Sequence, residues 1–156
     1  MRRILFVCLG NICRSPLVEA VARASLAEAG LDVAVASCGT GDWHAGEGAD
    51  PRMLAAAHAA GHDLSRHHAR QLRERDFVEH DLLLAMDRAN LRDLRQRAPA
   101  PELAAKAALF LEWSGAAPPV EFPDPWHGDE AGFAAAVALA ERSVAALVER
   151  LRHASR

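Results

Sequence analysis

The chain has 156 residues, half of them hydrophobic, a formal net charge of -3 and a pI near 6.2. These values are typical of one soluble domain over residues 1–156, and they argue against a general nucleic-acid binder, which carries a concentrated basic face. We expect no membrane span, because no stretch approaches the roughly 18 apolar residues it requires. The apolar part of the N-terminus is also too short for a secretory signal, so we expect a cytoplasmic protein.

The stretch 4–16 predicts a strand, a polar loop and the start of a helix. It opens with a short, wholly apolar run, typical of a strand in a parallel sheet, which stops at Cys8. Pro16 suits the first turn of a helix, and Ser15 is its expected cap. A cysteine facing a helix N-terminus across a loop closed by Arg14 lies where a thiolate and a phosphate are both stabilised. The pattern predicts a nucleophile at Cys8, with a buried structural cysteine as the alternative.

Helical and strand-like segments alternate along the rest of the chain. Apolar spacing, proline starts and glycine ends predict helices at 17–29, 52–60, 90–97 and 129–153. Short apolar runs predict strands at 4–7, 33–36, 81–86 and 104–111. The last strand is ambiguous because its alanines favour a helix, and its place in an alternating chain decides for strand.

This alternation predicts an open α/β sheet of four parallel strands. Ligands of such sheets bind outside the carboxyl ends of the strands. Cys8, the glycine-rich loop 37–44 and Asp87 all follow strands, so we expect them at one crevice.

Cys8 and Arg14 form a Cys-x5-Arg pattern that Ser15 follows. A loop this short can curl its backbone N–H groups around one tetrahedral oxyanion, and the arginine supplies a planar fork for two phosphate oxygens. The serine hydroxyl can donate to the thiolate.

Phosphoryl transfer to a thiolate also needs a proton donor for the leaving oxygen and a base for the water that follows. Asp124 can serve as both, because Pro123 and Pro125 restrict the backbone on either side of it. The alternative is a surface Asp-Pro turn.

Residues 7–16, together with Asp124, Pro125 and Trp126, resemble the low-molecular-weight protein tyrosine phosphatase family. The resemblance runs along nearly the whole chain, with further family-like segments at 37–40, 43–44, 50–52, 67–72 and 85–90. It implies a four-stranded parallel sheet with helices on both faces, a phosphate-binding loop after the first strand and a cysteinyl-phosphate intermediate. It also implies that the protein uses no metal and no cofactor.

By matching position, the resemblance makes Cys8 the nucleophile, Arg14 the phosphate ligand and Asp124 the general acid. Ser15 becomes the partner of the thiolate, and Ser37 and His67 support the loop together with Asn11. Asparagine also tolerates the left-handed conformation better than most residues. The implied phosphate-binding loop comprises Leu9, Gly10, Asn11, Ile12, Cys13, Arg14 and Ser15.

Trp43 and Trp126 look like two walls of a slot that admits a flat phosphoaryl group. Both lie in polar loops, although tryptophans are more often core residues. His127 stands where the family often has a second aromatic ring, and Cys38 where it usually has a small residue without a thiol. His127 can therefore change substrate choice.

Cys13 and the histidines leave alternatives open. Cys13 is either a redox partner that forms a reversible disulfide with Cys8 or a small apolar filler. His62, His67 and His68 lack cysteine or carboxylate ligands at metal-binding spacing, so we expect no metal site.

The favoured function is hydrolysis of phosphotyrosine and small aryl phosphates. The expected partner is a tyrosine-phosphorylated protein, such as a cognate tyrosine kinase, and the expected ligand is phosphate or another oxyanion. The main alternative is a thiol-dependent arsenate reductase of the same fold, but that chemistry passes electrons through downstream cysteines, and none follows Cys38. A phosphoprotein-binding module without turnover is a third hypothesis.

Overall fold

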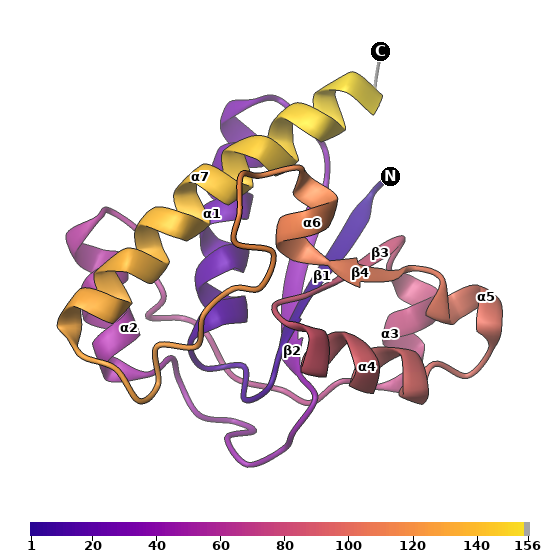
Figure 1. Cartoon of the computed structure of the whole chain (residues 1–156), viewed down its shortest axis with the longest axis horizontal. Coiled ribbons are helices and arrows are strands. Elements are labelled where there is room, and N and C mark those ends of the chain that lie inside the picture. Colours follow the sequence, from indigo (N-terminus) through magenta and orange to yellow (C-terminus); the bar gives the residue numbers. More distant parts are fainter. Residues whose placement is uncertain (155–156) are drawn as a thin grey trace.

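The computed structural model describes residues 1–154 and contains one parallel sheet of four strands (Figure 1). The strands are β1 (Arg3–Cys8), β2 (Ala34–Gly39), β3 (Leu82–Ala85) and β4 (Ala107–Leu109). They lie in the order β2-β1-β3-β4, and every neighbouring pair is parallel. The predicted sheet is therefore confirmed.

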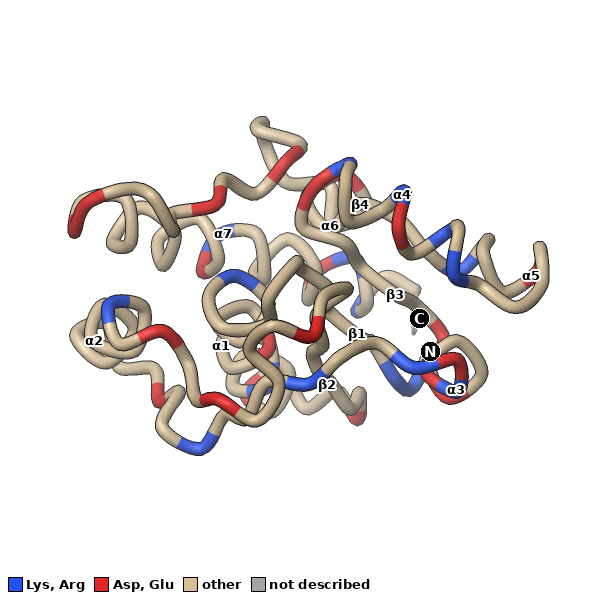
Figure 2. Tube along the Cα trace, turned by 90° about the horizontal axis from the view of Figure 1, so that it is seen from below, with Lys and Arg blue, Asp and Glu red and all other residues tan. Residues whose placement is uncertain are grey.

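Helices cover both faces of this sheet (Figure 1). The helices of one face are α1 (Arg14–Glu28), α2 (Pro51–Ala59), α6 (Phe110–Ser114) and α7 (Glu130–Ala154). Those of the other face are α3 (Glu74–Glu79), α4 (Arg88–Arg97) and α5 (Pro101–Ala104). Figure 2 shows that acidic and basic residues are interspersed along the chain.

β1 is buried on both faces because it lies between two neighbours inside a covered sheet. Ile4 and Phe6 point to the α1 and α7 side, whereas Leu5 and Val7 point to the α3 and α4 side. This period of two explains the uninterrupted apolar run before Cys8. The aromatic ring of Phe6 meets that of Phe110 edge to face, with ring centroids 5.6 Å apart.

Two helix-forming segments differ from the sequence prediction. The predicted strand 104–111 is β4 alone, flanked by α5 and α6, because Pro101 starts one helix and the alanine-rich, apolar ends favour helix over strand. α3 lies in a charged segment that carried no helical pattern. Its start is fixed by Asp76, whose carboxylate accepts a hydrogen bond from the Arg73 amide at 2.8 Å.

The predicted cap of α1 is wrong. The helix already begins at Arg14, and the capping position, Cys13, makes no side-chain cap. Ser15 lies inside the first turn, where its hydroxyl contacts Cys8 instead of the helix backbone.

Contrary to our expectation, one helix is long and apolar enough to cross a membrane. An 18-residue window of α7 has a mean hydropathy of 1.6, since its many alanines count as apolar. Half of that window is buried, and α7 packs against α1, α2 and α6. A core helix of a globular protein meets the same test, so the finding is a weak indication of a span.

The order of the strands determines where a ligand can bind. The chain leaves β1 for β2 on one side and then returns to β3 on the other side, so the topology switches between β1 and β3. In open α/β sheets the crevice lies at such a switch, outside the carboxyl ends of the strands. Cys8 ends β1, and Asp87 follows β3 at this edge.

We predict that Phe110→Ala lowers the free energy of unfolding by about 3–5 kcal/mol, because the ring is fully buried and a cavity would replace it. Urea denaturation followed by circular dichroism measures the change. Val78→Ala is the control, since Val78 is 68% exposed and should change stability by less than about 0.5 kcal/mol. Equal effects of the two substitutions would contradict the prediction.

Candidate active site

Residues 8–15, which we name the Cys8 loop, connect β1 to α1 and surround the Cys8 sulfur with donors. Cys8 Sγ lies 2.9 Å from Ser15 Oγ and accepts from the backbone N–H of Asn11 at 3.3 Å. Cys8 is only 2% exposed. Donors of this kind stabilise an anionic sulfur more than a neutral thiol.

Asn11 holds the loop in its curled shape. Its φ of 58° lies in the left-handed region, and its fully buried side chain makes three hydrogen bonds. The amide nitrogen donates to Ser15 Oγ at 2.8 Å and to Ser37 Oγ at 2.9 Å, and the amide oxygen accepts from the Arg70 N–H at 3.0 Å. Because Asn11 donates to Ser15, the Ser15 hydroxyl hydrogen has two acceptors left, the Cys8 sulfur at 2.9 Å and the Cys38 carbonyl at 3.4 Å, and the sulfur is the nearer.

His67 supports the same residue from outside the cavity. Its Nε2 lies 2.6 Å from the Asn11 carbonyl oxygen, and a carbonyl only accepts, so Nε2 carries the hydrogen. Burial lowers the pKa of His67 below its ordinary value of 6.5, despite the hydrogen bond to Asn11, which acts in the opposite direction. The imidazole is therefore neutral at pH 7.

Ser37 completes this support through Glu19, a residue that the sequence did not single out. Ser37 accepts from Asn11 and donates to Glu19 Oε1 at 2.5 Å. Glu19 lies on α1 among positions that alternate with apolar ones, so nothing in the sequence distinguished it from an exposed helix residue.

The end of β2 lies directly against the Cys8 loop. The N–H groups of Thr40 and Gly41 donate to the carbonyls of Cys8 and Leu9, both at 2.9 Å. A Cβ on Gly39 would lie 2.6 Å from the Leu9 carbonyl oxygen, so a residue with a side chain would push the two segments apart.

Arg14 lies under the cavity, almost completely buried. Its Nη1 donates to Asp87 Oδ2 at 2.8 Å and to the Phe122 carbonyl at 3.0 Å, and its Nη2 lies 3.7 Å from Asp124 Oδ2. Burial opposes the charge, but Cys8 and the two aspartates raise the pKa of Arg14 above its ordinary value. The guanidinium is thus a permanent cation held at a fixed angle.

The sequence predicted the place of Asp87 but not its role. It was expected at the crevice because it follows a strand. In the structure it also caps α4 by accepting from the Asn90 N–H at 2.8 Å, and it binds Arg14. One carboxylate therefore fixes both a helix and the arginine.

A cavity of about 270 Å³ opens above Cys8. Its lining brings together most of the predicted site: Cys8, Leu9, Gly10, Asn11, Ile12, Cys13, Arg14, Trp43, His44, Asp124, Trp126 and His127. Ser15, Ser37 and His67 are not in this lining. Ser37 and His67 instead contact Asn11 from behind the Cys8 loop.

The walls of this cavity are aromatic. Trp43 is 68% exposed, and its ring lies so close to Gly41 that a Cβ there would meet it at 1.8 Å. The rings of His44 and Trp126, which also line the cavity, have centroids 5.7 Å apart. His44 is a wall residue that sequence reasoning missed, because its position next to Trp43 did not reveal where its ring would point.

Asp124 lies at the rim of the cavity with a half-exposed side chain. Its Oδ1 accepts from the Trp126 N–H at 3.1 Å, and its Oδ2 is the atom that faces Arg14. A carboxylate in this place can exchange a proton with a group bound above the sulfur. Within residues 1–154, no group of three or more histidine, cysteine or acidic residues is placed to hold a metal ion.

A sequence profile described as low molecular weight phosphotyrosine protein phosphatase matches residues 3–156. The chain is 42% identical over 154 residues to a low molecular weight protein-tyrosine-phosphatase of Streptomyces coelicolor, covering 96% of this chain and 93% of that protein. It is 40% identical over 143 residues to the Wzb phosphatase of Salmonella typhi, covering 90% and 88%.

Solved structures give the same similarity. The protein tyrosine phosphatase of Entamoeba histolytica, with Hepes in its active site, superposes with a TM-score of 0.92 at 31% identity over the whole of both chains. Wzb of Vibrio vulnificus in complex with benzylphosphonate superposes with a TM-score of 0.83 at 30% identity, covering 96% of this chain and 98% of that one.

We predict that His67 titrates below pH 6.5 and is the Nε2–H tautomer when neutral, because burial disfavours its cation and the Asn11 carbonyl needs a donor. Below pH 6.5 the unfolded chain binds a proton at His67 that the folded chain does not bind. The contribution of His67 to the free energy of unfolding is therefore fully present above pH 6.5 and falls as the pH drops below it. Two-dimensional ¹H–¹⁵N NMR of the imidazoles, with His67→Gln to assign the signal, measures both properties. Titration at or above pH 6.5 would show that the prediction is wrong.

Proposed function

Because the chain belongs to the low molecular weight phosphotyrosine protein phosphatase family, we propose that it hydrolyses phosphotyrosine in proteins, and small aryl phosphates, through a cysteinyl-phosphate intermediate. The observation that carries the proposal is the lining of one cavity by a sulfur, a buried arginine and a carboxylate. We further propose that residues 1–156 form a single cytoplasmic phosphatase domain.

In the first step, the Cys8 thiolate attacks phosphorus while Arg14 and the N–H groups of the Cys8 loop bind the equatorial oxygens. The bond from phosphorus to the tyrosyl oxygen breaks, and Asp124 gives its proton to that oxygen. In the second step, Asp124 takes a proton from water, whose oxygen attacks phosphorus. The bond from phosphorus to sulfur then breaks, with Ser15 donating to the departing thiolate.

The shape of the cavity favours an aryl ester. Because Cys8 is nearly inaccessible at the base, a phosphoryl group must be carried down to it on a long, flat group. Trp43 and Trp126 both line the cavity and supply aromatic surface, which suits the phosphotyrosine ring but gives little contact to phosphoserine. The benzylphosphonate bound by Vibrio vulnificus Wzb, an aromatic ring on a phosphonate, is a ligand of this chemistry. The proposed natural partner is a tyrosine-phosphorylated protein, such as a cognate tyrosine kinase.

Arsenate reduction by a relay of thiols is not supported. All three cysteines lie within the first 38 residues, and Cys38 is fully buried in the core between the sheet, α3 and α4. Burial also raises the pKa of Cys38, so this sulfur is an unreactive thiol.

We predict that Cys8→Ser abolishes hydrolysis of 4-nitrophenyl phosphate, since a serine hydroxyl is not ionised near neutral pH and is a poor nucleophile. Asp124→Ala should lower kcat/KM for phenyl phosphate by about 10²- to 10⁴-fold, because phenol leaves poorly without a proton donor. Steady-state kinetics with both esters measure these effects, and exposed Arg142→Leu is the control. Hydrolysis by the Cys8→Ser protein would refute the proposed nucleophile.

Cys13 is our proposed redox partner of Cys8. In this reaction peroxide oxidises the Cys8 thiolate to a sulfenic acid, the Cys13 sulfur attacks it, water leaves and a disulfide forms. Burial and the nearby Asp50 raise the pKa of Cys13 to about 12, so Cys13 is a neutral thiol at pH 7 and loses its proton, to the hydroxyl that leaves Cys8 as water, only as the disulfide forms. Its place in the same loop as Cys8, and not its acidity, is what distinguishes it from Cys38.

We predict that peroxide-inactivated protein regains activity with dithiothreitol, whereas the Cys13→Ala protein does not, because its Cys8 proceeds to the sulfinic acid. Recovery of activity and the mass of the alkylated protein measure the outcome. Equal recovery of both proteins would instead identify Cys13 as an apolar filler.

A further inference from the structure

The loop that carries Asp124 has to be held at two points. It runs from α6 across the molecule to the start of α7, beside α2 (Figure 1). Phe122 anchors its first half, because the ring is buried, its N–H donates to the Met86 carbonyl at 2.8 Å and its carbonyl accepts from Arg14. Asp124 lies two residues beyond this anchor and needs a second one on its other side.

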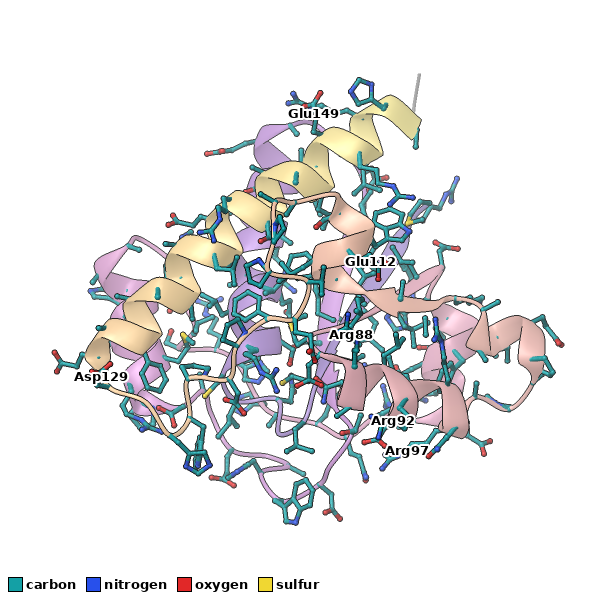
Figure 3. All side chains as sticks on the ribbon, viewed as in Figure 1. Arg88, Arg92, Arg97, Glu112, Asp129 and Glu149 are labelled. Carbon is teal, nitrogen blue, oxygen red and sulfur yellow. The ribbon has the colours of Figure 1, made fainter. Side chains whose placement is uncertain are left out.

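Arg52 provides that second anchor. Its Nη1 donates to the Trp126 carbonyl at 3.0 Å, two residues after Asp124. The guanidinium carbon also lies 5.2 Å from the centre of the Trp126 ring and 4.7 Å from that of Phe133 on α7. Figure 3 shows Asp129 at the start of α7, where this half of the loop ends.

The other donors of Arg52 are fixed by Asp50. Nε donates to Asp50 Oδ1 at 3.1 Å and Nη2 to Oδ2 at 3.0 Å, a bidentate pair. Although burial opposes the charge of Asp50, the hydrogen bonds from Arg52 lower the pKa of this carboxyl. The guanidinium is thus turned toward protein groups, which makes it a clamp and not a substrate ligand.

Asp50 also reaches the nucleophile's side of the cavity. Its backbone N–H donates to the Ile12 carbonyl of the Cys8 loop at 2.8 Å. A continuous path therefore runs from the Cys8 loop through Asp50 and Arg52 to the backbone of Trp126. Arg52 binds the Trp126 carbonyl, and the Trp126 N–H, on the other side of its Cα, donates to Asp124 Oδ1 at 3.1 Å. Both ends of this path lie at the same cavity.

We propose that Arg52, held by Asp50, is a positioning residue that orients the Asp124 carboxylate over the Cys8 loop by fixing the backbone of Trp126. This inference rests on the proposed function, because it assigns Arg52 an effect through the general acid. Loss of Arg52 should then weaken proton donation more than it weakens nucleophilic attack.

The test compares kcat/KM for phenyl phosphate, whose leaving group needs a proton, with that for 4-nitrophenyl phosphate, whose leaving group departs far more easily. Arg52→Leu should lower the value for phenyl phosphate about threefold to tenfold, the size expected for one typical lost hydrogen bond, and change the other less than about twofold. Arg52→Lys, which keeps the charge beside Asp50 but lacks the planar fork, should show the same selectivity. Arg142→Leu on the exposed side of α7 should change neither value.

A double-mutant cycle separates positioning from a general effect on the fold. In an Asp124→Ala background, Arg52→Leu should cause no further selective loss for phenyl phosphate, because the group that it orients is gone. Equal losses for both esters, or a selective loss that persists without Asp124, would overturn the inference. Circular dichroism shows which variants are folded, and Arg52→Lys carries the test if the leucine variant is not.

The same data separate this inference from the proposed function. If Asp124→Ala shows no preference for the better leaving group, the proposed general acid is wrong. If Asp124→Ala shows the preference and neither Arg52 variant does, the positioning inference alone fails.

Discussion

The buried amide of Asn11 is the interaction on which the rest of the site depends. A left-handed backbone at a residue with a side chain is costly, and it persists only where the surroundings hold it. Here α1 contributes Ser15, β2 contributes Ser37, the segment before α3 contributes the Arg70 amide, and His67 binds the carbonyl. Segments far apart in sequence thus share the task of keeping one peptide turned so that its N–H faces the sulfur.

The sheet order explains why these segments can meet. β1 lies between β2 and β3, so residues that follow all three strands are carried to one edge. From one side come Thr40 and Gly41, which bind the backbone of the Cys8 loop, and from the other comes Asp87, which binds Arg14. The Cys8 loop is therefore held on one side by the backbone that follows β2 and on the other by a side chain that follows β3.

The sequence was informative where local pattern decides structure. Apolar periodicity and the residues that start and end helices predict the strand before Cys8, the proline-led helices and the four-stranded parallel sheet. The family resemblance accounts for the choice of site residues. Features that depend on contacts between distant segments could not be predicted from the sequence. The short α3 depends on the Asp76 carboxylate, Glu19 matters only because β2 brings Ser37 to it, and His44 enters the cavity wall through the path of its loop. The cap at Ser15 was misplaced for the same reason, since a tertiary contact with sulfur uses that hydroxyl.

The close contact between Trp43 and Gly41 makes one wall of the cavity adjustable. The indole lies where any side chain at position 41 would be, so the missing Cβ sets how far the ring leans over the entrance. A single methyl group there would displace a largely exposed ring without touching the sulfur, the arginine or the acid. The width of the entrance can therefore diverge between relatives, or be engineered, independently of the reaction at its base.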